Sequence, residues 1–151
     1  MKIKRIIYLI LIILQLLVIF NFSAENGSKS SGRSHKFINN IINVYKSVSK
    51  SKIDNKEIIK TIEYPIRKCA HFTIYFILGI FVILFFLTFD IKYRYLFSGL
   101  FVYICACLDE VHQLFVPGRS GKLLDTFVDL FGSCIAFLII YLIRRKKTKN
   151  S

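Results

Sequence analysis

The sequence predicts an all-α, polytopic membrane protein with four transmembrane helices and a basic amphipathic loop between the first helix and the second. The chain has 151 residues, 54% of which are hydrophobic, and its mean hydropathy is +0.53. Its apolar runs are long enough to cross the roughly 30 Å hydrocarbon core of a bilayer. Its formal net charge is +13, and many cationic residues flank these runs, as they do beside membrane spans. A nucleic-acid binder would carry such charge on a soluble scaffold, so we expect no nucleic-acid partner.

The first predicted helix covers residues 6–22 and follows three cationic residues. This apolar run is long for a secretory signal peptide. The plausible cleavage site, after Ala24, has bulky Phe22 at the third position back, where a small residue is expected. We therefore expect residues 1–22 to be a retained N-terminal transmembrane anchor.

Residues 23–64 are predicted to form a polar and amphipathic extracytoplasmic loop. The stretch 21–34 is rich in Ser, Gly and Asn, which is typical of a polar loop. Residues 35–63 carry apolar side chains at helical spacing among lysines. This basic stretch could lie on anionic lipid headgroups or pack over the helix bundle.

Residues 65–151 are predicted to form a core of three further helices with a cationic cytoplasmic tail. Pro65 suits the first turn of a helix, and the apolar run 69–89 is long enough to span. Residues 95–108 alone are too few to span. A helix that continues to Val116 is long enough and carries polar residues into the membrane.

The fourth predicted helix covers residues 123–143 and precedes the cationic tail. The positive-inside rule assigns the N-terminal cations, the short turn 90–94 and the tail 144–149 to the cytoplasmic side. We therefore expect a multi-pass protein of the cell membrane with both termini in the cytoplasm. The polar ends of the second, third and fourth helices then meet on the extracytoplasmic side.

Polar residues at these ends form the predicted site. At about 1.5 Å of rise per residue, His71, Asp109 and Asp129 lie at one depth. Gly132 and Ala136 on the fourth helix have the small-x-x-x-small spacing that allows a neighbouring helix to approach closely. The candidate ligand-binding residues are Arg67, Lys68, His71, Tyr75, Asp109, Glu110, His112, Gln113, Arg119, Asp125 and Asp129.

Such a cluster has more than one chemical interpretation. It could be an ion-pair network that locks three helices together, or a binding or acid–base site. Asp109, Glu110, His112 and His71 could bind a divalent metal, but the order D-E-x-H lacks the two histidines of H-E-x-x-H. We therefore expect no metal and no other cofactor. Ser120, in the sequence GRSG, is interpreted as a turn residue rather than a nucleophile.

Two stretches resemble the VanZ-like family of bacterial membrane proteins. They are RKCAHFTIYFILGI, from Arg67 to Ile80, and DEVHQLFVPGRSGKLLDTFVDLFG, from Asp109 to Gly132. The founding member is linked to resistance to teicoplanin, a lipid-tailed glycopeptide. The resemblance therefore implies a bacterial cell-envelope protein that contributes to antibiotic resistance of the teicoplanin type.

Two classes of function are open at this point. In the first, the outward-facing polar site binds a lipid-linked or anionic ligand, the partners being membrane lipid and either a lipid-linked envelope precursor or a glycopeptide. In the second, the protein is an enzyme that acts on such a precursor or on a phospholipid headgroup. Asp109 or Glu110 would then be the general base and His71 the acid, while cationic residues hold phosphate.

Overall fold

The chain folds into helices joined by short connections. The computed structural model describes residues 2–49 and 55–149, and the side chains of residues 2–44 and 57–148. Within these ranges the ordered elements are all helices, which confirms the predicted fold class. They are α1 (Lys2–Ser23), α2 (Gly27–Ser49), α3 (Asn55–Phe86), α4 (Arg94–Leu114) and α5 (Leu123–Lys149).

Four of the helices, α1, α3, α4 and α5, are long and apolar enough to cross a membrane. Their outward faces carry large exposed apolar side chains such as Leu14, Leu108 and Leu142. In water such a surface would be costly, whereas hydrocarbon solvates it. The chain is therefore a multi-pass membrane protein.

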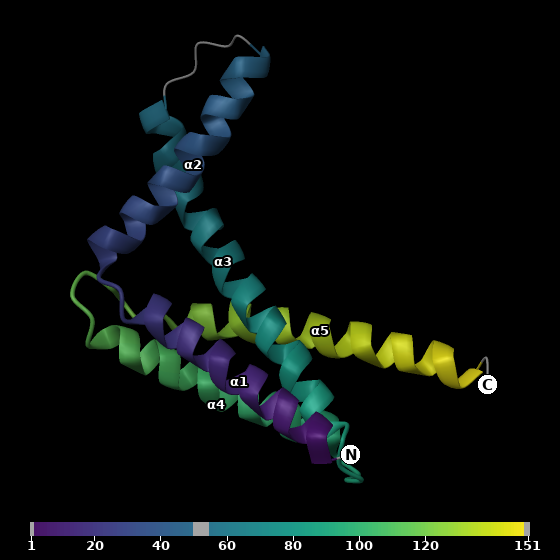
Figure 1. Ribbon diagram of the computed structural model, residues 1–151. Coiled ribbons are helices and arrows are strands. Elements are labelled where there is room, and N and C mark those ends of the chain that lie inside the picture. The colour runs from purple at the N-terminus through teal and green to yellow at the C-terminus, as the bar shows by residue number, and fades with distance from the viewer. Residues whose placement is uncertain (1, 50–54, 150–151) are drawn as a thin grey trace.

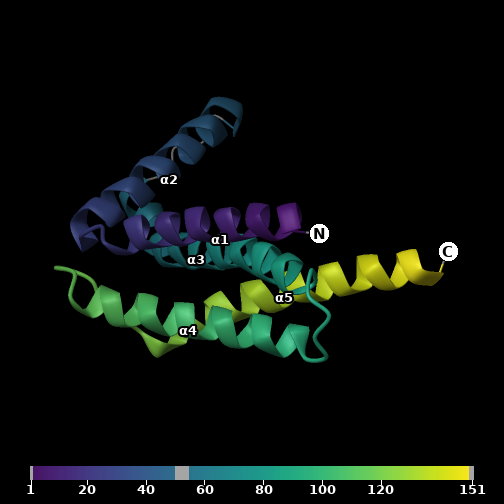
Figure 2. The same ribbon diagram turned by 60° about the horizontal axis from the view of Figure 1, so that its bottom comes forward.

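Helix α3 is the centre of the arrangement and contacts each of the other four helices (Figures 1 and 2). Its buried face carries Tyr75, Leu78 and Val82, which pack with Ile12 of α1 and Val102 of α4. Ser133 of α5 is also buried and donates a hydrogen bond of 2.8 Å to the Tyr75 carbonyl. This position gives α3 access to polar groups from every other helix.

Small residues set the close approach of α3 and α5. A Cβ atom added to Gly132 would lie 2.5 Å from the carbonyl oxygen of Phe72, and one added to Gly79 would lie 2.9 Å from the Cα of Ser133. Ala136 is fully buried in the same contact. The expectation from the small-x-x-x-small spacing is confirmed.

The predicted polar loop at residues 21–34 is wrong. Helix α1 continues to Ser23, and α2 begins at Gly27, after a bend of three residues. The side chain of Asn26 caps α2 by accepting a hydrogen bond of 2.9 Å from the Lys29 N–H, which satisfies a free donor of the first turn. Ile38 and Ile42 then bury the apolar face of α2, so capping and packing outweigh the low helix propensity of Ser and Gly.

Helix α3 begins before Pro65 and not at it, which corrects the expected helix start. Pro65 lies inside the helix and removes one backbone donor. The preceding turns pack against α2, and His35 Nε2 lies 2.9 Å from Glu63 Oε2 across this contact. Figure 1 shows α2 and the start of α3 projecting together away from the other helices.

The remaining boundaries differ from the expectation by small amounts. Helix α4 ends at Leu114, two residues early, and Gly118 has a φ of +73° in the turn that follows. Helix α5 continues to Lys149, so the expected cationic tail is helical. The proposed division into anchor, loop and core stays a prediction. In the structure α1 packs against both α3 and α4, so it is in contact with the helices of the predicted core.

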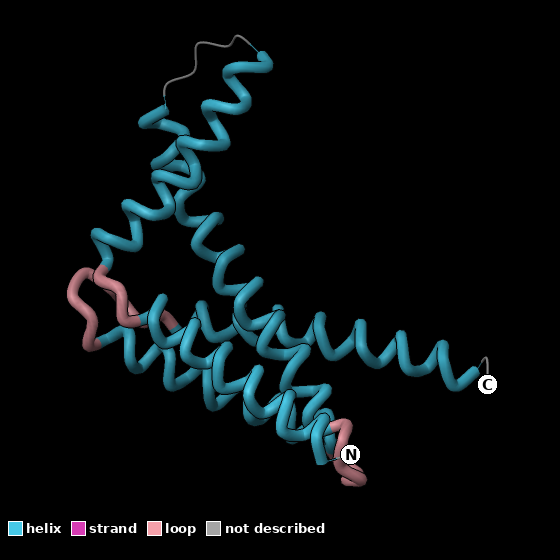
Figure 3. Tube along the Cα trace, viewed as in Figure 1, coloured by secondary structure: helices cyan, strands magenta, loops and turns pink. Residues whose placement is uncertain are grey.

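The two connections that border the site lie side by side (Figure 3). The Gly27 N–H donates a hydrogen bond of 3.0 Å to the Pro117 carbonyl, which joins the α1–α2 turn to the α4–α5 loop. At the opposite end, Arg5 Nη2 donates to the Thr88 carbonyl at 2.9 Å. Both ends of α1 are thus held against the rest of the molecule.

Candidate functional site

Four titratable side chains from three helices meet inside the helix bundle. His71 of α3, Asp109 and Glu110 of α4, and Asp129 of α5 place one donor atom each within 4.8 Å of one another. The three carboxylates are buried, and Asp129 is 0% exposed. The expectation that His71, Asp109 and Asp129 meet at one depth is confirmed. We call these four residues the His–carboxylate cluster.

Specific hydrogen bonds hold the members of the cluster. His71 Nδ1 lies 3.3 Å from Asp129 Oδ1. Gln113 Nε2 donates to Asp109 Oδ2 at 3.1 Å and to Glu110 Oε1 at 3.4 Å, and the Lys122 N–H donates to Glu110 Oε2 at 2.6 Å. The α4–α5 loop therefore folds back onto the end of α4 and fixes the glutamate.

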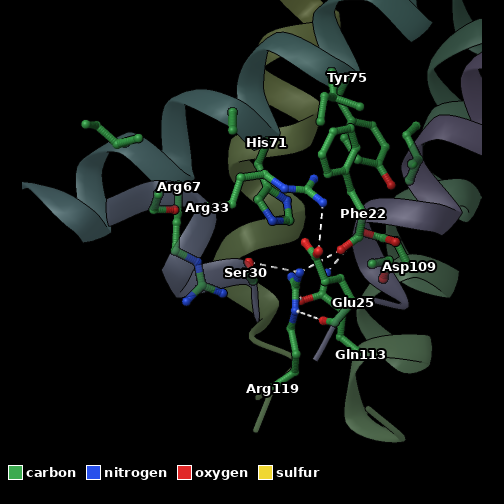
Figure 4. Close-up of a pocket in the computed structure, with 16 residues that line it drawn as sticks. Phe22, Glu25, Ser30, Arg33, Arg67, His71, Tyr75, Asp109, Gln113 and Arg119 are labelled. Atoms are coloured by element: carbon green, nitrogen blue, oxygen red, sulfur yellow. Dashed lines mark hydrogen bonds and ion pairs between the residues drawn. The ribbon is translucent and has the colours of Figure 1, made fainter. Parts of the chain in front are cut away.

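A cavity of about 150 Å³ opens beside the cluster (Figure 4). His71, Tyr75, Asp109 and Gln113 form part of its wall, which includes residues from α1, α2, α3, α4 and the α4–α5 loop. Arginines from three different segments also line it. They are Arg33 of α2, Arg67 of α3 and Arg119 of the α4–α5 loop. The main cavity therefore brings carboxylates and guanidinium groups to one space.

The side chain of Arg119 donates its hydrogen bonds to groups of the protein itself. Its Nε donates to the Glu25 carbonyl at 2.9 Å, and its Nη2 donates to the Phe22 carbonyl at 2.6 Å and to Ser30 Oγ at 3.2 Å. Its Nη1 donates to Gln113 Oε1 at 3.4 Å. Burial lowers the pKa of Arg119, but a guanidinium is basic enough to remain charged. Arg119 thus joins the α1–α2 turn to α4, with most of its donors already used.

Arg67 has a different environment. It lines the main cavity and also a second cavity of about 70 Å³, which contains Lys68, Lys122 and Asp125. Lys68 and Asp125 form an ion pair there. Among the residues whose side chains the structure describes, Arg67 has no ion-pair partner. Its charge is therefore available to an anionic ligand.

An open apolar groove of about 400 Å³ lies between α3 and α5. Phe127, Val128 and Phe131 form much of its wall. Tyr64 and Lys68 line both this groove and the second cavity, so the two spaces share a border. We call this space the α3–α5 groove. The groove therefore joins an apolar surface to the polar residues of the second cavity.

The structure brings most of the predicted site residues together, with one exception. His112 stacks on Phe20 of α1, with ring centroids 4.8 Å apart, and it lines neither polar cavity. Because the ring packs against α1, His112 lies outside the His–carboxylate cluster. The other ten predicted residues line a polar cavity or belong to the cluster.

Sequence reasoning missed the contribution of the α1–α2 turn. Arg33 Nη2 forms an ion pair with Glu25 Oε1 at 2.7 Å, and both residues line the main cavity together with Ser30 (Figure 4). These residues follow the first membrane helix and were interpreted as a polar loop. The Ser-rich composition marked the segment as unusual, but only the packing of α1 against α3 and α4 places it over the cavity.

Comparison with known families gives a match that covers most of the chain. A family model described as VanZ/LLP1 matches residues 5–144, which include all the residues of the His–carboxylate cluster and of both polar cavities. Comparison with curated proteins and with solved structures gives no match.

Proposed function

Because the chain belongs to the VanZ/LLP1 family, we propose that it is a cell-envelope membrane protein whose polar site binds an anionic, lipid-linked ligand. The observation that carries the proposal is Arg67, a cation without an ion-pair partner among the described side chains, at the wall of both polar cavities. A guanidinium can hold a phosphate or carboxylate through two parallel hydrogen bonds. Lys122 of the second cavity adds a positive charge nearby.

The α3–α5 groove supports the lipid-linked part of the proposal. It is apolar, open and bordered by Lys68, so a ligand could leave its hydrocarbon chain in the bilayer while its charged group enters the second cavity. A soluble anion has no hydrocarbon chain that the apolar groove could accommodate. The ligand class therefore includes anionic phospholipids and lipid-linked envelope precursors.

We further propose that the site faces the extracytoplasmic side and that ligand binding there contributes to resistance against teicoplanin-type glycopeptides. These antibiotics act outside the cytoplasmic membrane and carry a lipid tail. A protein that binds or displaces lipid-linked molecules at that surface would change how the antibiotic reaches its target. The family relationship motivates this role, and Arg67 gives it a testable residue.

The binding proposal is tested with the full chain in nanodiscs that contain phosphatidylglycerol or phosphatidylcholine. Native mass spectrometry counts the lipids that remain on the protein after release. We expect Arg67→Gln to retain several-fold less phosphatidylglycerol than the native chain. Arg144→Gln, an exposed arginine on α5, is the matched control and should retain the native amount. Equal retention by the Arg67 variant would contradict the proposal.

The resistance proposal needs a separate measurement. Cells that express the native chain should tolerate more teicoplanin than cells without it, and Arg67→Gln should remove that difference at equal protein level. Vancomycin, which has no lipid tail, serves as the comparison antibiotic. If expression leaves the teicoplanin susceptibility unchanged, the resistance role fails while lipid binding can still stand.

An enzyme is the second candidate, and one observation favours it. The carboxylate of Asp129 lies beside His71 Nδ1 and can orient the imidazole, as acid–base sites require. Glu110 would be the base of such a site. Mass spectrometry of lipid extracts from cells with and without the gene tests this candidate. A covalently altered lipid that disappears in Glu110→Gln supports catalysis, and identical lipid profiles contradict it.

A further inference from the structure

The His–carboxylate cluster combines one imidazole with three buried carboxylates, and such a set has an unbalanced charge. An ionised group at membrane depth is costly unless an opposite charge, water or a ligand compensates it. Lys68 is paired with Asp125, and Arg33 with Glu25, so these two cations have other partners. Three carboxylates this close together repel one another, and a bound cation would offset that repulsion.

From this arrangement we propose that the cluster binds one divalent first-row transition-metal cation through His71, Asp109, Glu110 and Asp129. Imidazole nitrogen and carboxylate oxygen together suit Zn²⁺, Mn²⁺ or Fe²⁺. The inference goes beyond the proposed lipid site and does not depend on it. It replaces the expectation of no metal, which rested on the order of residues within one helix.

The distances in the cluster fit a common ion. Donor atoms about 2.0–2.2 Å from one metal lie at most roughly 4.4 Å from one another. In the cluster all four donor atoms fall within 4.8 Å, so small side-chain rotations suffice. The 3.3 Å between His71 Nδ1 and Asp129 Oδ1 is long for a hydrogen bond but matches two ligands of a tetrahedral ion, about 3.3 Å apart.

Asp129 supplies an independent sign of a ligand. Its side chain is 0% exposed, and its Oδ2 atom has no hydrogen-bond partner among the described residues. A buried carboxylate oxygen without a partner is costly, and native structures rarely leave one unexplained. Because Oδ1 of the same carboxylate already contacts His71, the unpartnered oxygen lies at the cluster. A cation bound there would satisfy it.

The surroundings of the cluster are those of a prepared metal site. Gln113 and the Lys122 N–H hold Asp109 and Glu110, and such outer hydrogen bonds orient metal ligands. His71 and Asp109 also line the main cavity, which gives the ion and its water ligands a route of entry. The cation would sit beside the proposed lipid site, where it could contact an anionic group.

The test uses the full chain in detergent, treated with chelator and then titrated with MnCl₂ or ZnCl₂ in the absence of added lipid. We expect saturable binding of about one ion per chain and a rise in the melting temperature, because a ligand that binds only the folded state stabilises it. Asp129→Asn and His71→Asn should each lose this binding. Asp90→Asn, an exposed aspartate on the turn between α3 and α4 and outside both polar cavities, is the matched control that keeps it.

Two further measurements separate a lost metal site from a lost fold. Circular dichroism of the chelated Asp129 and His71 variants should match that of the native chain. Gln113→Leu should lower the affinity for the metal ion roughly tenfold without abolishing binding, because loss of a hydrogen bond to a metal ligand has this effect. The proposal is overturned if neither Mn²⁺ nor Zn²⁺ binds the native chain, if Mg²⁺ or Ca²⁺ binds equally well, or if Asp129→Asn binds as the native chain does. None of these outcomes affects the lipid-retention measurement on the Arg67→Gln variant, so the two proposals can fail separately.

Discussion

Glycine serves two different purposes in the membrane helices of this protein. Gly132 of α5 faces the backbone of α3, and an added Cβ atom would lie 2.5 Å from the Phe72 carbonyl oxygen. Gly99 of α4 has open space instead, since an added Cβ would meet only Phe137, at 4.0 Å. The two residues have the same intrinsic cost in a helix, so their different surroundings decide the effect of a methyl group.

Gly132→Ala should therefore destabilise the protein, and Gly99→Ala should not. Forcing a methyl group into a filled contact costs about 1–3 kcal/mol. A glycine replaced by alanine in a helix with free space gains about 0.5–1 kcal/mol. Thermal unfolding in detergent, followed by circular dichroism, measures both. A Gly132→Ala variant as stable as the Gly99→Ala variant would show that α3 and α5 do not meet at Gly132.

At the scale of elements, the α1–α2 turn is positioned by a residue far away in the sequence. Arg119 donates hydrogen bonds to the Phe22 carbonyl at the end of α1 and to the Glu25 carbonyl of the turn, and the Gly27 N–H donates to the Pro117 carbonyl. These contacts hold the turn over the main cavity, and Ser23 beside it is 3% exposed. The turn therefore depends on the α4–α5 loop for its place.

Arg119→Lys should loosen this turn. Lysine cannot reproduce the fork of donors, and each hydrogen bond lost from a charged donor costs about 1.5–3 kcal/mol. We expect the thiol of a Ser23→Cys variant, in a chain without its native cysteines, to react at least about tenfold faster when Arg119 is replaced, since tenfold corresponds to about 1.4 kcal/mol. Arg145→Lys on the exposed end of α5 is the control. If Arg119→Lys leaves the labelling rate as unchanged as Arg145→Lys does, other contacts hold the turn.

At the scale of the whole molecule, the polar site and the basic helix ends lie far apart. Arg5 bonds to Thr88, so the basic start of α1 lies beside the turn that contains Lys92. Both chain termini lie on the same side of the molecule in Figures 1 and 2, while the α4–α5 loop lies on the other side. The positive-inside rule then predicts a cytoplasmic side for the termini and an extracytoplasmic side for the site.

Cysteine labelling tests this orientation. In a chain without native cysteines, Ser120→Cys on the α4–α5 loop should react with an impermeant thiol reagent on whole cells. Lys92→Cys, which is also exposed but lies at the opposite end, should react only after the membrane is opened. The reverse pattern would place the site on the cytoplasmic side and remove the basis for the resistance role.

The local sequence pattern determined the four membrane helices and the depth of the polar residues, because span length and rise per residue follow from nearby residues alone. It also identified Gly132 as a contact position. It indicated helical spacing from residue 35 onward but not the start of α2 at Gly27, because that Ser- and Gly-rich turn depends on the Asn26 cap and on the packing of α2 against α3. The tertiary structure also decided which groups share the site: His112 turns to Phe20, while Glu25 and Arg33 join the main cavity. Rise per residue places side chains at one depth, but which of them share a cavity depends on contacts between residues distant in the sequence, and only the folded chain decides those contacts.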